Sequence, residues 1–195
     1  MFYRLTVGEC RADEFVDFWS SLYSGLAGDV EALYVENINK PEFSPYDLMA
    51  LFQWKNGMRL SALKNTTLQE KILRKLPTVN KLKKHFSLGE FEQDFPNLGT
   101  IWKIFLLHCI QPDTYPIFDQ HVFRAMCYLQ DHQVSEVSGS DRQKYRQYLD
   151  LYLPYFNTVV EQSCCSKVKA DRALWMFGKA LKLTWVQTIF QSCRV

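Results

Sequence analysis

One stretch of the sequence, residues 95–126, holds the residue types that could carry chemistry. Pro96, Asn97 and Gly99 stand together just before an apolar segment, and an acid, Asp119, follows a proline-bounded loop. Proline fixes its own φ, while asparagine and glycine adopt left-handed backbone conformations at the least cost. These three residues therefore predict a tight hairpin.

A hairpin of this kind directs successive backbone N–H groups outward at the start of the next helix. Such N–H groups, together with the positive end of the helix dipole, form a seat for a phosphate. The same residues also fit an ordinary turn between two helices. The pattern alone leaves both interpretations open.

The segment 101–110 is apolar on nearly all sides, with Lys103 and His108 as its strongly polar residues, and this predicts a buried central helix. Asp119 precedes a second helix with apolar residues at core spacing. The simplest role of Asp119 is an N-cap, in which the carboxylate accepts hydrogen bonds from the first N–H groups of that helix. A cap of this kind needs no active site.

The order of proline, hairpin glycine, helix, loop and D-x-H-x-x-R resembles the helix-hairpin-helix-GPD superfamily of base-excision DNA glycosylases. FPNLGTI lies over the family pattern LPGVGxK, and IFDQHVFR lies over VDTHIxR. The segment between them fits an endonuclease III-like pattern without a gap. Over the rest of the chain the resemblance rests on the order of the helices.

The resemblance implies a role for each matching residue. Asp119 matches the catalytic aspartate, which would stabilise positive charge developing on the sugar and would orient or deprotonate the attacking water. Gln120, His121 and Arg124 would support this aspartate. The residues implied to bind the DNA backbone are Pro96, Asn97, Leu98, Gly99 and Thr100.

The resemblance extends to a loop that, in this family, fills the gap left by a flipped base. A helix starting at Ser44 and ending near Gly57 would lead into that loop, with Lys55, Asn56 and Arg59 as the wedge and its phosphate contacts. WKNGMR is not the usual family sequence here. The alternative is a helix C-cap with basic residues that interact favourably with the helix dipole.

Two departures from the family pattern limit what is carried over. Ile101 occupies the position of the Schiff-base lysine, and Lys103 lies about 200° further around the helix axis. The iron–sulfur cysteine run of some members is absent. We therefore expect a monofunctional enzyme that leaves a free base and an intact abasic strand, with no metal. No cofactor is expected beyond a monovalent cation at the hairpin backbone, Asn97 to Gly99.

Composition places the chain among globular proteins. Its 195 residues are 47% hydrophobic and 15% aromatic, and the net charge is +2. No apolar run approaches the roughly 20 residues of a membrane helix, and the N-terminus lacks a signal-peptide layout. We expect a cytoplasmic protein with double-stranded DNA as its partner and no membrane contact. Six scattered cysteines without C-x-x-C indicate reduced thiols.

Charge is distributed unevenly along the chain. Residues 1–50 contain nine acids and three bases, whereas residues 55–84 contain nine bases and one acid, Glu70. Such a basic run fits either a track for DNA phosphates or a solvated helix face. Its closeness to the hairpin favours DNA. The uninterrupted bases are Lys71, Arg74, Lys75, Lys81, Lys83 and Lys84.

The other segments read as helices, apart from a short strand or extended lead-in at residues 2–7. Phe15, Phe18, Trp19, Leu22 and Tyr23 recur at the spacing of one helix face. A capping box at Thr67 and Glu70 predicts a helix over 68–76 that Pro77 ends, and another is expected over 79–86. Towards the C-terminus we expect a helix over 141–160, bent or broken at Pro154, and one over 167–183 in which Gly178 marks close packing.

The sequence therefore predicts an all-α fold, a two-lobed helical bundle containing a helix-hairpin-helix motif. The 195 residues would form one compact unit, with lobes at about 45–130 and at the packed termini 1–44 and 131–195. The function expected is monofunctional excision of a flipped base by Asp119. The alternative is a non-catalytic helix-hairpin-helix module that binds DNA or a protein partner.

Overall fold

The structure is a computed structural model that describes residues 8–23 and 28–192. Helices form all the regular secondary structure in these two ranges, so the predicted all-α fold is confirmed. The strand or extended lead-in expected at residues 2–7 lies outside the described residues.

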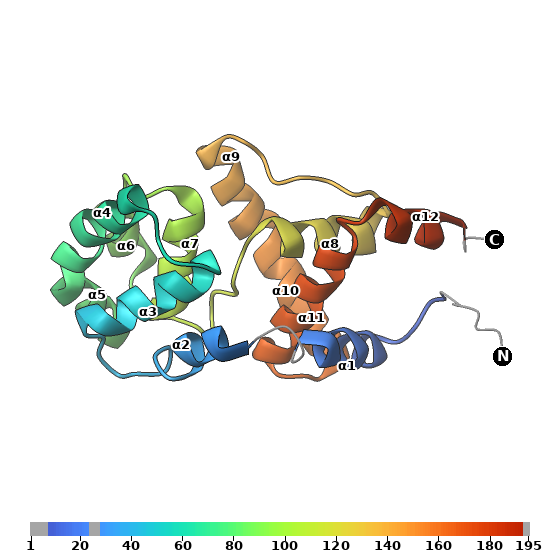
Figure 1. Cartoon of the computed structure of the whole chain (residues 1–195), viewed down its shortest axis with the longest axis horizontal. Coiled ribbons are helices and arrows are strands. Elements are labelled where there is room, and N and C mark those ends of the chain that lie inside the picture. Colours follow the sequence, from blue (N-terminus) through green and yellow to red (C-terminus); the bar gives the residue numbers. More distant parts are fainter. Residues whose placement is uncertain (1–7, 24–27, 193–195) are drawn as a thin grey trace. The chain divides into compact units, whose positions relative to one another are not determined.

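The chain folds as two compact units (Figure 1). The terminal unit contains both ends of the sequence, Met1–Leu26 and Phe118–Val195, and the central unit contains Ala27–Ile117. Residues 27–44 thus belong with the hairpin segment, and residues 118–130 belong with the terminal segments. The hairpin therefore lies in the central unit, and Asp119 lies in the terminal unit.

Helix α11 is the centre of the terminal unit and packs against both α1 and α8. The ring of Phe177 on α11 is buried and contacts the rings of Phe15, Trp19 and Tyr128. The helices are α1 (Ala12–Tyr23), α8 (Gln120–Asp131), α9 (Asp141–Arg146), α10 (Leu153–Ser163), α11 (Lys167–Ala180) and α12 (Thr184–Ser192).

The inward face of α1 is narrower than the sequence predicted. Phe15 and Trp19 contact Phe177, whereas Phe18 and Leu22 are 58% and 42% exposed. Successive residues of a helix are separated by 100° around its axis, so residue 18 lies about 60° from residue 15, on the side away from residue 19. Leu22 lies in the last turn of α1.

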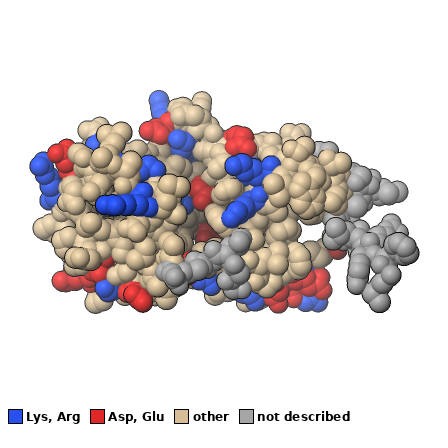
Figure 2. All heavy atoms as spheres, in the orientation of Figure 1, with Lys and Arg blue, Asp and Glu red and all other residues tan. Residues whose placement is uncertain are grey.

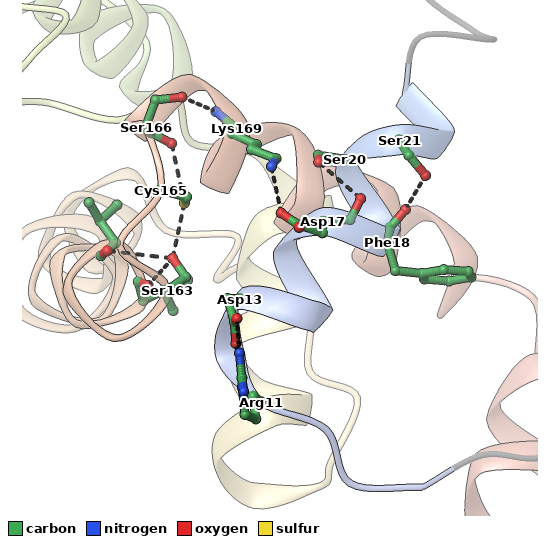
Figure 3. Close-up of polar contacts among 12 residues, drawn as sticks. Arg11, Asp13, Asp17, Phe18, Ser20, Ser21, Ser163, Cys165, Ser166 and Lys169 are labelled. Carbon is green, nitrogen blue, oxygen red and sulfur yellow. Dashed lines mark hydrogen bonds and ion pairs between the residues drawn. The ribbon is translucent and has the colours of Figure 1, made fainter.

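Polar contacts join the same helices at the surface (Figure 3). Lys169 of α11 forms an ion pair with Asp17 of α1. Ser166 caps α11, because its hydroxyl oxygen accepts a hydrogen bond of 3.3 Å from the backbone N–H of Lys169. In the turn before α11, the hydroxyl of Ser163 lies 3.0 Å from the sulfur of Cys165.

Gly178 lies where α11 and α8 approach each other closely. A Cβ atom built on Gly178 would stand 1.8 Å from the carbonyl oxygen of His121. Only a residue without a Cβ fits at this distance, so the predicted close packing at Gly178 is confirmed.

The helix expected over 141–160 changes its hydrogen-bond register just before Pro154. A π-helical turn spans Gln147–Tyr152, and α10 begins at Leu153 with Pro154 in its first turn. Proline has no N–H to donate to the preceding turn. The expected bend therefore takes the form of a π turn placed where that hydrogen bond is lost.

In the central unit, helix α3 (Pro45–Asn56) begins and ends where the sequence predicts. The hydroxyl of Ser44 accepts from the N–H of Asp47, while the carboxylate of Asp47 accepts from the N–H of Ser44 at 2.7 Å. Gly57 ends the helix at φ 69°. The helices of this unit are α2 (Ala32–Val35), α3 (Pro45–Asn56), α4 (Ala62–Lys71), α5 (Leu76–Lys84), α6 (Leu88–Asp94) and α7 (Thr100–Ile110).

The helices expected over 68–76 and 79–86 were wrong in their boundaries. Ser61 caps α4, so Thr67 lies in the middle of that helix and donates its hydroxyl hydrogen to the carbonyl of Leu63. A short 3₁₀ helix, Leu73–Lys75, follows. Pro77 lies in the first turn of α5 instead of ending a helix, because its missing N–H is not needed there.

Helix α7 forms the core of the central unit, as its apolar sequence predicts. His108 is fully surrounded within it: Nδ1 donates to the carbonyl of Tyr115, and Nε2 accepts from the hydroxyl of Tyr34, each at 2.7 Å. Burial lowers the pKa of His108 to about 4, although the bond to Tyr115 opposes this shift. The imidazole is therefore neutral and structural.

Candidate functional site

The hairpin predicted from the sequence is an exposed turn between α6 and α7. Pro96, Asn97 and Gly99 lie at the surface. Leu98 and Thr100 between and after them are each only 6% exposed. Leu98 thus fixes the turn to the core, while its neighbours present their backbone to solvent.

The expected left-handed conformations at Asn97 and Gly99 were wrong. Gly99 has φ −55° and ψ 138°, and Asn97 is not among the described residues with positive φ, which are Gly57, His132 and Cys164. A Cβ built on Gly99 would meet nothing within 4 Å. The backbone at Gly99 is therefore accessible, and no local strain requires glycine there.

Two lysines of the basic run contact backbone carbonyls in or just before this hairpin. The ammonium group of Lys71 donates to the carbonyl of Asn97 at 2.7 Å, and that of Lys75 donates to the carbonyl of Asp94. Lys75 also lies over the ring of Phe95, 5.3 Å from its centre. An ammonium has three N–H donors, so the exposed Lys71 retains donors for a second acceptor.

The remaining bases of the run have other contacts. Lys81 pairs with Glu90 at 3.0 Å, and Lys84 pairs with Glu42. Lys83 is half-buried and donates to the carbonyl of Cys109 at 3.1 Å. On the face drawn in Figure 2, basic and acidic side chains are interspersed. Lys81, Lys83 and Lys84 thus have partners within the protein, and a phosphate track along residues 71–84 stays a prediction.

At the start of α7, Ile101 is half-buried. The ammonium of Lys103 lies over the ring of Phe91 at 5.9 Å from its centre. Burial lowers the pKa of Lys103, with Glu92 opposing that shift.

Of the residues considered for a base-flipping wedge, Lys55 and Asn56 end α3, and Arg59 follows its C-cap. The side-chain amide of Asn56 donates to the carbonyl of Met58 at 2.9 Å, and its oxygen accepts from Lys64. Lys55 lies 5.9 Å from the centre of the Phe105 ring, and Arg59 is exposed. Asn56 thus organises the turn around Gly57, as the C-cap interpretation predicts.

Asp119 caps helix α8. Its Oδ1 atom accepts hydrogen bonds from the backbone N–H groups of His121 at 2.8 Å and Val122 at 3.3 Å. The side chain is half-buried. The N-cap interpretation is therefore confirmed, and the cap holds the carboxylate in one orientation.

Two of the residues expected to support Asp119 hold helices together. Arg124 is 3% exposed, pairs with Glu136 at 2.8 Å and donates to the carbonyl of Gly178 at 2.8 Å. The ring of His121 packs against Trp175, with the ring centres 5.4 Å apart. Burial lowers the pKa of His121, although Asp119 opposes that shift.

Gln120 has a different environment from its neighbours. Its Oε1 accepts from the backbone N–H of Val137 at 3.1 Å. Its Nε2 is buried and has no hydrogen-bond partner among the described residues. The residue that follows the predicted catalytic aspartate thus has a buried donor left for another acceptor.

Tyr152, just before α10, also has a polar atom without a partner. Tyr152 is fully buried, and its hydroxyl has no hydrogen-bond partner among the described residues. Its ring lies 5.2 Å from that of Phe118, the residue before Asp119. Burial raises the pKa of Tyr152, and Asp171 and Asp119 raise it further. The spacing of Tyr148 and Tyr152 predicts a shared face but not an unpartnered hydroxyl.

A cleft of about 540 Å³ in the terminal unit lies elsewhere, between α1 and the start of α11. Its walls include Asp17, Ser20, Lys169 and Arg172.

Residues 8–23 and 28–192 contain no cluster of three or more His, Cys, Asp or Glu side chains suited to a metal ion. No helix in these ranges is long and apolar enough to cross a membrane.

The described cysteines, Cys10, Cys109, Cys127, Cys164 and Cys165, are free thiols, and Cys193 lies outside the described residues.

Comparison with protein-family models, curated proteins and solved structures found no match to this chain.

Proposed function

We propose that this protein binds double-stranded DNA through the hairpin at residues 96–100. The observation that supports the proposal is the accessible backbone of Asn97 and Gly99 just before α7. The ammonium group of Lys71 is bonded to the carbonyl of Asn97, and that of Lys75 is bonded to the carbonyl of Asp94 at the end of α6. This arrangement agrees with the resemblance to helix-hairpin-helix proteins.

Binding would be independent of sequence. Backbone N–H groups at the N-terminus of a helix and nearby ammonium groups recognise phosphate oxygens, not base edges. Each phosphate that a lysine neutralises releases counterions, so affinity falls steeply as salt rises. A single hairpin makes few such contacts, and this agrees with a protein of net charge +2.

Fluorescence anisotropy with a labelled duplex over a series of salt concentrations tests the proposal. Lys71→Gln and Lys75→Gln should each weaken binding and reduce the slope of log K against log salt by about 0.9. Lys81→Gln and Lys84→Gln are matched controls, because these lysines pair with Glu90 and Glu42. Equal loss in all four variants would refute a site at the hairpin.

A second candidate function is monofunctional base excision by Asp119. The observation that favours it is a half-buried carboxylate fixed by two backbone N–H groups, with the unpartnered donor of Gln120 beside it. Such a carboxylate can stabilise positive charge on a sugar and orient water. A non-catalytic DNA-binding module, the alternative, needs only the cap.

Excision from a panel of lesion-containing duplexes separates these alternatives, with products analysed before and after alkali. Asparagine is as good an N-cap as aspartate, so Asp119→Asn removes the charge and retains the cap. Base release that needs alkali for strand cleavage and is lost in Asp119→Asn would support excision. DNA binding without release from any lesion would identify a non-catalytic module.

A further inference from the structure

Two buried donors without partners belong to residues near Asp119: Gln120 is its neighbour in sequence, and Tyr152 interacts with it electrostatically. Gln120 follows Asp119 directly, and Tyr152 packs on Phe118, which precedes Asp119. Buried polar groups in folded proteins are nearly always hydrogen-bonded to protein or to ordered water. An unpartnered buried donor therefore indicates a water molecule, an ion or a catalytic role.

Ring contacts and a hydrogen bond hold the residues around Asp119 in place. Phe118 contacts the rings of both Tyr148 and Tyr152. Arg124 and Gly178 hold α8 against α11. The two donors are therefore held by the core of the terminal unit, and the site needs no contribution from the central unit.

We propose that Tyr152 and Gln120 hold a buried water molecule against the carboxylate of Asp119, so that Tyr152 is a positioning residue for the Asp119 site. The water would accept hydrogen bonds from the Tyr152 hydroxyl and from Gln120 Nε2, and it would donate to Asp119 and to Asp171 on α11. Buried waters typically make two to four hydrogen bonds, and this arrangement supplies four.

The protonation state of Tyr152 agrees with its proposed role as a hydrogen-bond donor. Burial raises the pKa of Tyr152 well above its usual range, with Asp171, Asp119, Tyr148 and Tyr155 acting in the same direction. The phenol is therefore neutral and keeps the hydrogen that it donates. On α8 the titratable group that interacts with Asp119 is His121, and the charged group near His121 is Arg124, which pairs with Glu136.

The consequence for catalysis rests on the second candidate function. A water held by two donors donates strongly to the carboxylate and favours its ionised form. Removing the Tyr152 hydroxyl weakens this donor and raises the pKa of Asp119. If Asp119 catalyses base excision, the acidic limb of the rate–pH profile moves to higher pH by the same amount.

Titration of the Asp119 carboxyl carbon by ¹³C NMR in the free protein tests the inference independently of catalysis. Asp119→Asn assigns the signal, and thermal denaturation confirms that each variant folds. Tyr152→Phe and Gln120→Leu should raise the Asp119 pKa by about half a unit or more. Tyr148→Phe is the matched control, because it removes a fully buried hydroxyl from the same ring cluster.

Unchanged titration of Asp119 in folded Tyr152→Phe, or an equal shift in Tyr148→Phe, would overturn the inference. A shift in Tyr152→Phe and Gln120→Leu alone supports the water site. If that shift occurs and the wild type releases no base from any lesion, the water site stands and base excision fails. The two failures are thus distinguishable.

Discussion

The lysines between residues 71 and 84 differ in what their ammonium groups contact. Lys71 is exposed and bonded to the hairpin carbonyl of Asn97. Lys83 is half-buried, lies 4.2 Å from the centre of the Phe43 ring and has its pKa lowered by burial, with Cys109 opposing that shift. The sequence alone makes these lysines equivalent, because a run of charges does not specify which ones the fold will use internally.

His108 provides a pH-dependent test of the central unit. Its pKa in the folded protein is about 4, against about 6.5 for an unfolded histidine. The unfolded state binds more protons between these values, so stability should fall as pH decreases from about 6.5 to 4, by about 3 kcal/mol in total. Urea denaturation at several pH values in this window measures the slope.

The matched variant for this test is His108→Gln, which has no titrating side chain at this position. We expect a lower stability at neutral pH, because the bonds to Tyr34 and Tyr115 are altered. Its stability should change less between pH 6.5 and pH 4 than that of the wild type. Parallel curves for the two proteins would show that His108 is not the group responsible.

Gly178 is the glycine at which a side chain would be most damaging. Gly178→Ala would place a Cβ 1.8 Å from a backbone oxygen of α8, so the two helices must separate. We expect a loss of about 1–3 kcal/mol or more in the free energy of unfolding. Gly89→Ala on α6 is the control and should be neutral or stabilising by up to about 1 kcal/mol, because its nearest neighbour atom is 4.0 Å away.

The structure requires glycine at position 178 but not at position 99. A glycine within a helical pattern implies a packing reason, and Gly178 has one. At the hairpin, proline, asparagine and glycine also fit a turn with ordinary φ values. The inward side chain of Leu98 fixes the direction of that turn, and a turn-residue pattern contains no information about such an anchor.

At the scale of elements, Ser44 and Thr67 both match the pattern of a helix N-cap, but only Ser44 caps a helix. Ser44→Ala removes a hydroxyl that accepts from the N–H of Asp47 and donates to its carboxylate at 2.8 Å. We expect a loss of about 1 kcal/mol in stability. Thr67→Ala, in the middle of α4, should change stability by less than about 0.5 kcal/mol. Equal effects in chemical denaturation would contradict these cap assignments.

The boundaries of α4 and α5 show why sequence signals for helix ends can mislead. The pattern at Thr67 to Glu70 matches a capping box, but the helix is capped by Ser61, which precedes Thr67 by six residues. Pro77 is compatible both with the end of one helix and with the first turn of the next. The observed helix boundaries bury Leu68 and Ile72 completely. Which boundaries the chain adopts therefore depends on packing against the rest of the fold.

At the scale of the whole molecule, the division of the chain was the least predictable feature. Helical periodicity predicts which face of α1 is apolar, but it does not identify α11, near the other end of the chain, as the partner. The cap at Asp119 follows from the sequence, whereas the unpartnered donors of Gln120 and Tyr152 depend on contacts between distant segments.

The net charge of +2 makes DNA binding depend on local geometry at the hairpin. Glycine permits close approach of the backbone to a ligand, so a methyl group on Gly99 should stand between the hairpin and a phosphate. The same methyl group meets nothing within 4 Å in the protein itself. Binding and stability can therefore be separated at this residue.

The most direct measurement is the dissociation constant of a duplex for the wild type, Gly99→Ala and Gly89→Ala at one low salt concentration. We predict that Gly99→Ala keeps the wild-type melting temperature and binds about tenfold more weakly, a difference of about 1.4 kcal/mol. Gly89→Ala should bind like the wild type. Equal affinity of all three proteins, or no binding by any of them, would contradict a DNA site at the hairpin.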